Sequence, residues 1–449
     1  MSREELIALI HEQQRLIEQL RNEIEELRRG GRRQAAPFSK GKPVKNPRRP
    51  GRKPGEGIFR RRNAPLQPPS EVVTAIIPPC CPHCGGGLEQ AGAEVVTITE
   101  LPKPQPVVIA YQVPICRCRG CGKSVRGTAA GLAADQTGAT AHRVGPGVMA
   151  AAHALHYGMG IPVRKVPQVL EELTGVRVTQ SAVTQDALRR AAGLAGRTYE
   201  QLRLGIAQSP AVYTDDTGWR ISGQNAFLMA FDTDEATVYQ IRSQHRNKEV
   251  REVVPASYAG VMISDRGKSY DAEELAGLAQ QKCLSHLLRN VSEVVKGKQG
   301  RARQFGATLS ALLREGLALW QARSELSATH FRSRCRQLDE QLTSHLRLRM
   351  LRDADNQRLL DGIGLQHDRG NLLRFLDCES VEPTNNRAER SLRPAVIARK
   401  VSQCSKNQRG ADAFAVFMSI AQTARKALDT TVSRAFRELF SVPITSTAR

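Results

Sequence analysis

The order of apolar segments between residues 211 and 265 constrains the fold of this chain most strongly. Three strand-like segments, a helical stretch and a fourth strand-like segment follow one another, with the strands at 211–214, 226–231, 237–241 and 260–264. The first strand ends at Asp215 and the fourth ends at Asp265. Strands that follow one another closely usually pair, and a helical crossover can bring a later strand beside them. We therefore expect a sheet with two acidic strand ends.

This strand order is that of the ribonuclease-H-like fold, in which the first and fourth strands are neighbours and their carboxylates converge. A third carboxylate then comes from a later helix, and Glu389 fits that place because Thr384 or Asn385 can cap a helix in which it lies one turn inside. Three converging carboxylates supply the oxygen ligands that two Mg²⁺ (or Mn²⁺) ions need for phosphoryl transfer. The pattern predicts a two-metal site formed by Asp215, Asp265 and Glu389.

Two CxxC motifs indicate a second metal. Cys81 and Cys84 precede three glycines, and 33 residues separate them from Cys118 and Cys121. Two thiolate pairs on glycine-containing turns suit tetrahedral coordination of structural Zn²⁺, which can stabilise a domain too small for a core of its own. We expect these four cysteines to bind zinc.

The sequence between the two motifs completes the predicted zinc ribbon, which spans residues 71–127. Segments 95–98 and 107–111 are β-like and apolar. Cys80 and Cys116 leave the ligand set partly open, because Cys116 forms an alternative pair with the cysteine two residues later.

Basic residues are concentrated near the N-terminus. The chain has 66 Lys and Arg against 44 Asp and Glu, a net charge of +22, and residues 28–70 contain fourteen basic residues and one acid. Frequent Pro and Gly predict a disordered linker that contacts a polyanion. Within it, Arg52 and Lys53 in the segment PGRKP are similar to a minor-groove hook. A generic phosphate-binding tether is the alternative.

A heptad repeat precedes the linker. One seam position of the heptad holds β-branched residues: Ile10, Ile17 and Ile24. The other holds Leu6, Leu20 and Leu27, with Gln13 as its one polar residue. This pattern favours a parallel two-stranded coiled coil, and hence a homodimer or a higher synaptic oligomer. The alternative is an amphipathic helix that packs on its own chain.

The residues after the zinc motifs show the sequence pattern of a helix–turn–helix. Gly175 lies in the turn, and Thr179 or Ser181 can cap the second helix. The second helix of such a motif reads the DNA major groove. We expect DNA contacts from residues near its start, including Arg177, Gln180 and Ser181.

Four ordered motifs give the chain a specific resemblance. They are TDDTGWR at 214–220, SDRGKSY at 264–270, CLSHLLR at 283–289 and NNRAERSLR at 385–393. Together with the heptads, the basic linker and the CPxCGG motif, they resemble the DDE transposases of the IS66 insertion-sequence family, the TnpC-like proteins. The resemblance implies catalytic acids at Asp215, Asp265 and Glu389.

Two further positions concern the predicted metal site. The family usually has Asp-Glu-Thr in the first motif, where this chain has Asp216 after Asp215, so either acid is a candidate metal ligand. Alternation along a strand places them on opposite faces, and we choose Asp215. His286 completes a C-x-x-H feature with Cys283 that several DDE transposases share. We expect it to orient a phosphate or support the metal site; a core histidine is the alternative.

The predicted architecture is multidomain α+β. Basic and polar residues of the last motif and beyond it should contact DNA phosphates: Asn386, Arg390, Arg393 and Lys400. The expected parts are a coiled-coil helix (1–29), a linker (30–70), a zinc ribbon (71–127), a helical DNA-binding region (128–207), a catalytic domain in two parts (208–296 and 381–430) around a helical insertion (297–380), and a C-terminal tail (431–449).

The expected function is transposition. The enzyme binds double-stranded DNA at the terminal repeats of its element, cleaves there, and joins the 3′-hydroxyl to target DNA, with accessory proteins of the same element as possible partners. No run of 18 apolar residues and no signal peptide occur, so we expect a cytoplasmic, nucleoid-associated bacterial protein. A non-catalytic zinc DNA-binding regulator and a metal-dependent nuclease without joining are the alternatives.

Overall fold

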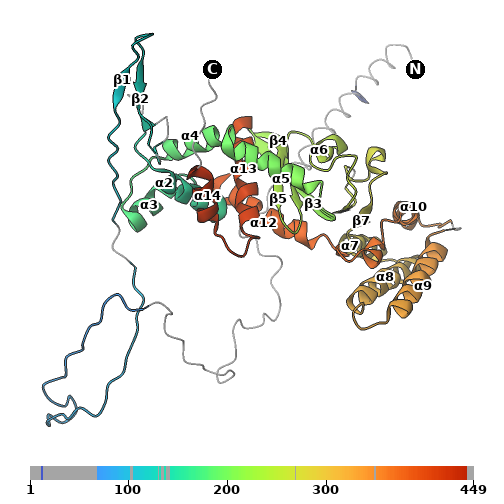
Figure 1. Cartoon of the computed structure of the whole chain (residues 1–449). Coiled ribbons are helices and arrows are strands. Elements are labelled where there is room, and N and C mark those ends of the chain that lie inside the picture. Colours follow the sequence, from blue (N-terminus) through green and yellow to red (C-terminus); the bar gives the residue numbers. More distant parts are fainter. Residues whose placement is uncertain are drawn as a thin grey trace. The chain divides into compact units, whose positions relative to one another are not determined.

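The computed structural model describes residues 12–13, 68–101, 105–129, 131–132, 136–137, 142–267, 269–347 and 350–441. The chain divides into two units, Met1–Pro102 and Lys103–Arg449. Figure 1 shows the helices and strands of the second unit. Apart from helical Glu12 and Gln13, the predicted heptads lie outside the described residues, as do Arg52 and Lys53 of the linker.

A five-stranded mixed sheet forms the centre of the second unit. Its order is β5-β4-β3-β6-β7, in which β3, β4 and β5 form an antiparallel meander and β6 and β7 run parallel to β3. The bounds are β3 (Ala211–Ile221), β4 (Gln224–Asp232), β5 (Thr237–Arg242), β6 (Val261–Ser264) and β7 (Gln280–Lys282). The four expected strands are present, but the first does not end at Asp215: it continues to Ile221, because residues 215–221 pair with β4. Strand β7 is an addition that the sequence did not indicate.

Helices cover both faces of this sheet, because β3 alternates apolar side chains between them. Tyr213 packs with α7 (Leu284–Val295), whereas Val212 packs on the other face with Val250 of α6 (Asn247–Arg251). The helix α12 (Asn386–Ser402) lies against β3 and β4. A short 3-10 helix, η3 (Glu273–Leu275), lies between β6 and β7 in the sequence.

Helices before and after the sheet share one hydrophobic core with it. Ala150, Tyr157 and Ala187 pack in the same cluster as Leu228 of β4 and Phe417. The contributing helices are α12 and, in addition, α2 (Pro146–His153), the π-helix η2 (Ala154–Gly158), α4 (Gln180–Ala191), α5 (Leu194–Ile206), α13 (Gln408–Ala424) and α14 (Val432–Ser441).

Helix α14 occupies part of the segment that we expected to be a C-terminal tail. Phe436 and Phe440 are four residues apart and both are buried, so one face of this helix is apolar and packs against α2. The expectation of a tail is wrong for residues 432–441, because two aromatic side chains in ten residues supply enough apolar surface to order the segment.

The expected helix–turn–helix pair is present. Helix α3 (Val166–Thr174) ends at Gly175, whose φ of 70° is the left-handed conformation that glycine adopts most readily. The Thr179 hydroxyl accepts a hydrogen bond from the Ala182 N–H at 3.1 Å and so caps α4. Leu170 and Val183 pack the two helices against α2.

The expected insertion is helical. It comprises α8 (Gly300–Gln321), α9 (Ala328–Leu346), α10 (Ala354–Asp368) and α11 (Arg374–Asp377). Leucines of α8 and α9 join the buried cluster that includes Tyr213 and Ile263, so the insertion shares a core with the sheet. Among the described helices, none is long and apolar enough to cross a membrane.

The cysteine-rich segment has less sheet than predicted. A short antiparallel hairpin pairs β1 (Ile115–Arg117) with β2 (Ser124–Arg126). The strands expected at 95–98 and 107–111 are wrong, since no described residue of either forms part of a strand. Their side chains are exposed, for example Val95 at 92% and Val108 at 90%. Alternating apolar residues form a strand only where a paired neighbour satisfies the backbone.

Candidate functional site

The sheet brings Asp215, which lies within β3, beside Asp265, which directly follows the end of β6. Tyr213 pairs with Ile263 in the parallel ladder of β3 and β6, so the same register places Asp215 level with Asp265. Tyr213 and Ile263 pack on the face that α7 covers. Because side chains two residues apart share a face, Asp215 belongs to the face that bears α7 and α12.

Asp216 belongs to the opposite face. Its Oδ1 lies 3.2 Å from Nδ1 of His245. The hydroxyl of Thr214, which shares this face, lies 3.3 Å from the hydroxyl of buried Tyr270. The arrangement therefore supports the choice of Asp215 for the side of the sheet on which α12 lies.

Three hydrogen bonds hold the start of α12 against β3 and α7. The Asn385 N–H donates to Sγ of Cys283 at 3.1 Å, and the Asn385 side-chain amide donates to the Thr214 carbonyl at 2.8 Å. The Leu284 N–H donates to the Pro383 carbonyl at 2.9 Å. Asn385 thus contacts both the strand that carries Asp215 and the helix that carries His286.

This anchoring places Glu389 beside His286. The Oε1 atom of Glu389 is 3.8 Å from Nε2 of His286, and both side chains are partly exposed. The Cys283 thiol raises the pKa of His286. Burial opposes ionisation of Cys283, but His286 and the Asn385 N–H together lower the pKa of its thiol. His286 is therefore a cation-prone group next to the third predicted acid.

The two aspartates of β3 have raised pKa values. Burial, followed by the nearby charges of Asp265 and Asp216, raises the pKa of Asp215 to about 7. Burial and Asp265 raise the pKa of Asp216 to about 6. Carboxylates that repel one another in a partly buried place are stabilised by a cation, so the oxygen donors fit a divalent metal. In the described residues, however, no three acidic, His or Cys side chains are close enough to hold a metal ion.

A buried ion network that the sequence analysis missed fixes α12 to β4. Asp232, 1% exposed at the end of β4, accepts hydrogen bonds from Arg387 at 2.7 Å and from Ser391 at 2.9 Å. Nζ of Lys426 lies 2.9 Å from Oδ1 of Asp232, the oxygen that also accepts from Ser391. The segment that begins with Asp232, DTD, is typical of a turn, and no local spacing in the sequence points to the distant Arg387 as its partner.

The predicted DNA-contacting residues of α12 form one exposed stripe. Asn386, Arg390, Arg393 and Lys400 are all exposed and are spaced three, four or seven residues apart. Such spacing places side chains on one face of a helix. Glu389 precedes Arg390 and lies four residues before Arg393, so the stripe runs beside the predicted acid.

The predicted residues of the helix–turn–helix are also exposed. Arg177 pairs with Glu171 at 2.7 Å, and Gln180 and Ser181 occupy the first turn of α4. Their side chains are accessible to a ligand at the start of the second helix.

The two CxxC motifs have the same local structure, each within its own unit. The Cys81 N–H donates to the Gly86 carbonyl, and the Gly85 N–H donates back to the Cys81 carbonyl, both at 2.9 Å. The second motif repeats these two bonds around Cys118, at 2.8 and 3.0 Å, with partners Lys123 and Gly122. Gly85 and Gly122 have φ values of 73° and 69°, a backbone conformation that residues other than glycine adopt only with strain.

The turns also favour thiolates. Backbone N–H groups of His83 and Cys84 lower the pKa of Cys81, and those of Cys121 and Gly120 lower the pKa of Cys118. Cys116 differs, because it lies on β1 opposite Val125 rather than in a turn. The repeated turn therefore supports Cys118 and Cys121 as the second pair of zinc ligands.

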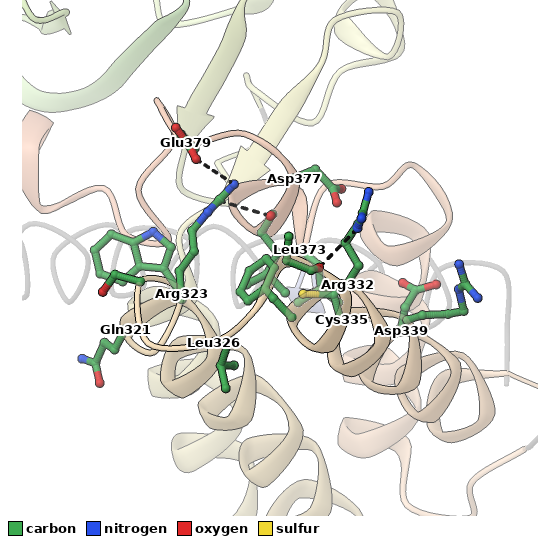
Figure 2. A pocket seen from close by; sticks show the side chains of 15 residues that line it. Gln321, Arg323, Leu326, Arg332, Cys335, Asp339, Leu373, Asp377 and Glu379 are labelled. Carbon is green, nitrogen blue, oxygen red and sulfur yellow. Dashed lines mark hydrogen bonds and ion pairs between the residues drawn. The ribbon is translucent and has the colours of Figure 1, made fainter.

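A separate cavity of about 1080 Å³ lies in the helical insertion (Figure 2). Figure 2 shows Arg323 directed toward Glu379. Its Nη2 lies 3.3 Å from Oε1 of Glu379, and its Nη1 donates to the Leu376 carbonyl at 3.3 Å. Trp320 and Phe331 add aromatic walls. None of the predicted catalytic residues lines this cavity, so the acidic site is not the large cavity of the insertion.

Comparison with known families gives two matches. The family model described as "Transposase IS66 family" matches residues 142–413, and the model described as "zinc-finger binding domain of transposase IS66" matches residues 78–122. The first match contains the sheet, the acids and the insertion, and the second contains both CxxC motifs. No curated protein matches the chain.

Proposed function

The chain belongs to the IS66 family of transposases, and we propose on this premise that it cleaves DNA at the ends of its insertion sequence and joins the 3′-hydroxyl to target DNA. The observation that carries the proposal is the placement of Asp215 and Asp265 on neighbouring parallel strands, with Glu389 on the helix that covers the same face. The strand order β5-β4-β3-β6-β7 supports a ribonuclease-H-like catalytic domain.

In this proposal, Asp215, Asp265 and Glu389 hold two Mg²⁺ or Mn²⁺ ions. The ions would activate the attacking water or 3′-hydroxyl and stabilise the leaving oxygen. Asp215 must lose its proton before it can bind a cation, since its pKa is raised to about 7. Glu389 must approach the two aspartates more closely than in this structure, and its side chain is partly exposed.

Other residues of the site bind or orient DNA. His286 lies next to Glu389 with a raised pKa, and is placed to contact a phosphate near the acids. The stripe of Asn386, Arg390, Arg393 and Lys400 would contact the DNA backbone, which positions a duplex without reading its sequence. Sequence reading would fall to Arg177, Gln180 and Ser181 of the helix–turn–helix.

Structural Zn²⁺ completes the proposal. Cys81, Cys84, Cys118 and Cys121 would bind one ion, and four protein ligands leave no open position for catalysis. The identical turns and lowered thiol pKa values of Cys81 and Cys118 support this ligand set. Zinc would therefore support the DNA-binding segment rather than the chemistry.

The test is a strand-transfer assay with Mg²⁺ on DNA that carries the ends of the element. We expect joined product from the wild type and none from Glu389→Gln, because the substitution removes an anionic ligand and keeps its size. The matched control is Asp412→Asn, which makes the same change on an exposed face of α13 and should retain joining.

The products separate the alternatives. Cleavage without joined product would favour a nuclease. Retarded DNA without cleavage, even after the other proteins of the element are added, would favour a non-catalytic regulator and contradict the proposal.

A further inference from the structure

Lys282 is a buried cation with no part in the proposed chemistry. Its side chain is 1% exposed at the end of β7, directly beside the end of β6 that precedes Asp265. Removing an ammonium group from water costs several kcal/mol, so such a residue persists only where its partners compensate. The arrangement of those partners therefore indicates what the lysine holds in place.

The partners of Lys282 surround the segment that follows β6. Asp271 Oδ1 is 2.7 Å from Nζ, and Gln280 Oε1 accepts a hydrogen bond at 2.8 Å. Longer contacts of 3.3 to 3.4 Å reach the Ser264 hydroxyl and the carbonyl oxygens of Asp265 and Tyr270. The ammonium group thus contacts both ends of segment 265–271.

The segment itself fixes one oxygen of Asp265. The Gly267 N–H donates to Asp265 Oδ1 at 2.8 Å. A side chain at Gly267 would begin 3.0 Å from that oxygen and 3.3 Å from the Tyr270 ring, so the turn is tight. The orientation of the Asp265 carboxylate consequently depends on the backbone that Lys282 holds.

The same network reaches the helical insertion. Gln366 of α10, 2% exposed, donates to Asp271 Oδ1 at 3.3 Å, so one carboxylate oxygen serves both Lys282 and the insertion. The Lys282 N–H also donates to the Asn371 carbonyl at 2.8 Å. Asp271 therefore links β7, the segment after Asp265 and α10.

We propose that Lys282 is a positioning residue for Asp265. It holds Asp265 on one side and Tyr270 and Asp271 on the other, and through Asp271 it connects them to the helical insertion. The inference rests on the proposed role of Asp265 as a metal ligand. A merely structural lysine would affect folding but not the affinity of the folded protein for the metal.

The test measures Mn²⁺ binding to the full chain by electron paramagnetic resonance of the free ion. For Lys282→Met we expect affinity about 10- to 100-fold weaker than for the wild type, the usual effect of removing a group that orients a metal ligand. Because the substitution leaves Asp271 without its partner, the melting temperature should fall, so affinities are compared below the unfolding transition of each protein. Retardation of element-end DNA should stay close to wild type under these conditions. In cleavage assays, more Mn²⁺ should restore the rate.

The matched control is Lys298→Met. Lys298 is also a little-exposed, ion-paired lysine, but its partners Asp353 and Asp355 lie at the start of α10, away from segment 265–271. This variant should bind Mn²⁺ like the wild type.

A double variant keeps the test decisive if Lys282→Met does not fold. Lys282→Met with Asp271→Leu leaves no unpaired charge, and replacement of a whole buried pair is often tolerated. It should fold and still bind Mn²⁺ weakly. If a folded variant bound Mn²⁺ as tightly as the wild type, the role of Lys282 would be overturned but the proposed function would stand. If the wild type did not bind Mn²⁺, the proposed function would be overturned as well.

Discussion

At the scale of single residues, the candidate site depends on which of two adjacent aspartates shares a face with α12. Asp215 does, and Asp216 instead lies 3.2 Å from His245 on the other side. Both have raised pKa values, so the metal-free site holds protons that a divalent cation must displace.

This leads to a prediction about pH. The pKa of Asp215 rises from about 3.9 in the unfolded chain to about 7 in the folded one. The folded state therefore binds this proton more tightly, and the stability that it contributes is present below about pH 4 and lost as the pH rises through about 7. We expect the free energy of unfolding without divalent metal to fall over this range more steeply for the wild type than for Asp215→Asn.

Urea denaturation at several pH values in the presence of a chelator measures this difference. Parallel pH profiles for the two proteins would contradict the raised pKa of Asp215. Mn²⁺ or Mg²⁺ should remove the loss above pH 7 in the wild type, because the cation replaces the proton.

At the scale of elements, the position of α12 depends on a buried carboxylate. Asp232 joins β4 to Arg387 of α12 and to Lys426, which follows α13. Arg387 also lies over the Tyr213 ring, 5.1 Å from its centre. The helix that carries Glu389 is therefore held at its first turns by charge and not only by apolar packing.

We predict that Asp232→Ala destabilises the protein by about 3–5 kcal/mol, because it leaves Arg387 and Lys426 without their buried counter-charge. Asp234 also pairs with Arg387 but is 77% exposed. Asp234→Ala should therefore cost only about 0–1 kcal/mol. Denaturant unfolding of the two variants measures the difference, and equal losses would mean that Asp232 does not hold the helix.

At the scale of the whole molecule, the chain combines a mixed sheet covered by helices with a cysteine-rich segment whose apolar side chains are largely exposed. Val95, Ile98 and Val108 are each at least 80% exposed. Such a segment gains little from hydrophobic burial, so bound metal should supply most of its folding energy.

We therefore predict one zinc ion per chain. Cys81→Ser and Cys118→Ser should each lower the zinc content and weaken binding to the terminal repeats. Cys116→Ser is the matched control and should keep the metal, since Cys116 lies on β1 and not in a turn. Elemental analysis of the purified variants gives the answer. Loss of zinc from Cys116→Ser as well as from Cys118→Ser would show that the alternative pair, Cys116 with Cys118, binds the metal.

Local sequence patterns were enough to predict many of the secondary-structure elements of this protein. Apolar runs that end at Asp215 and Asp265, the CxxC turns, and Gly175 with Thr179 could be predicted from the sequence, because each depends on spacing within a few residues. The four expected strands and the helical insertion followed from the same periodicities. The strands predicted at 95–98 and 107–111 failed because a strand also needs a partner.

The tertiary structure decided the rest. Strand β7 is the polar sequence QQK, yet all three residues are buried, which no hydrophobic pattern indicates. The partners of Lys282 include Asp271 and the Asn371 carbonyl, and those of Asp232 include Arg387 and Lys426; most lie far away in sequence. Buried charges acquire their role from the groups that surround them, and only the folded chain brings those groups together.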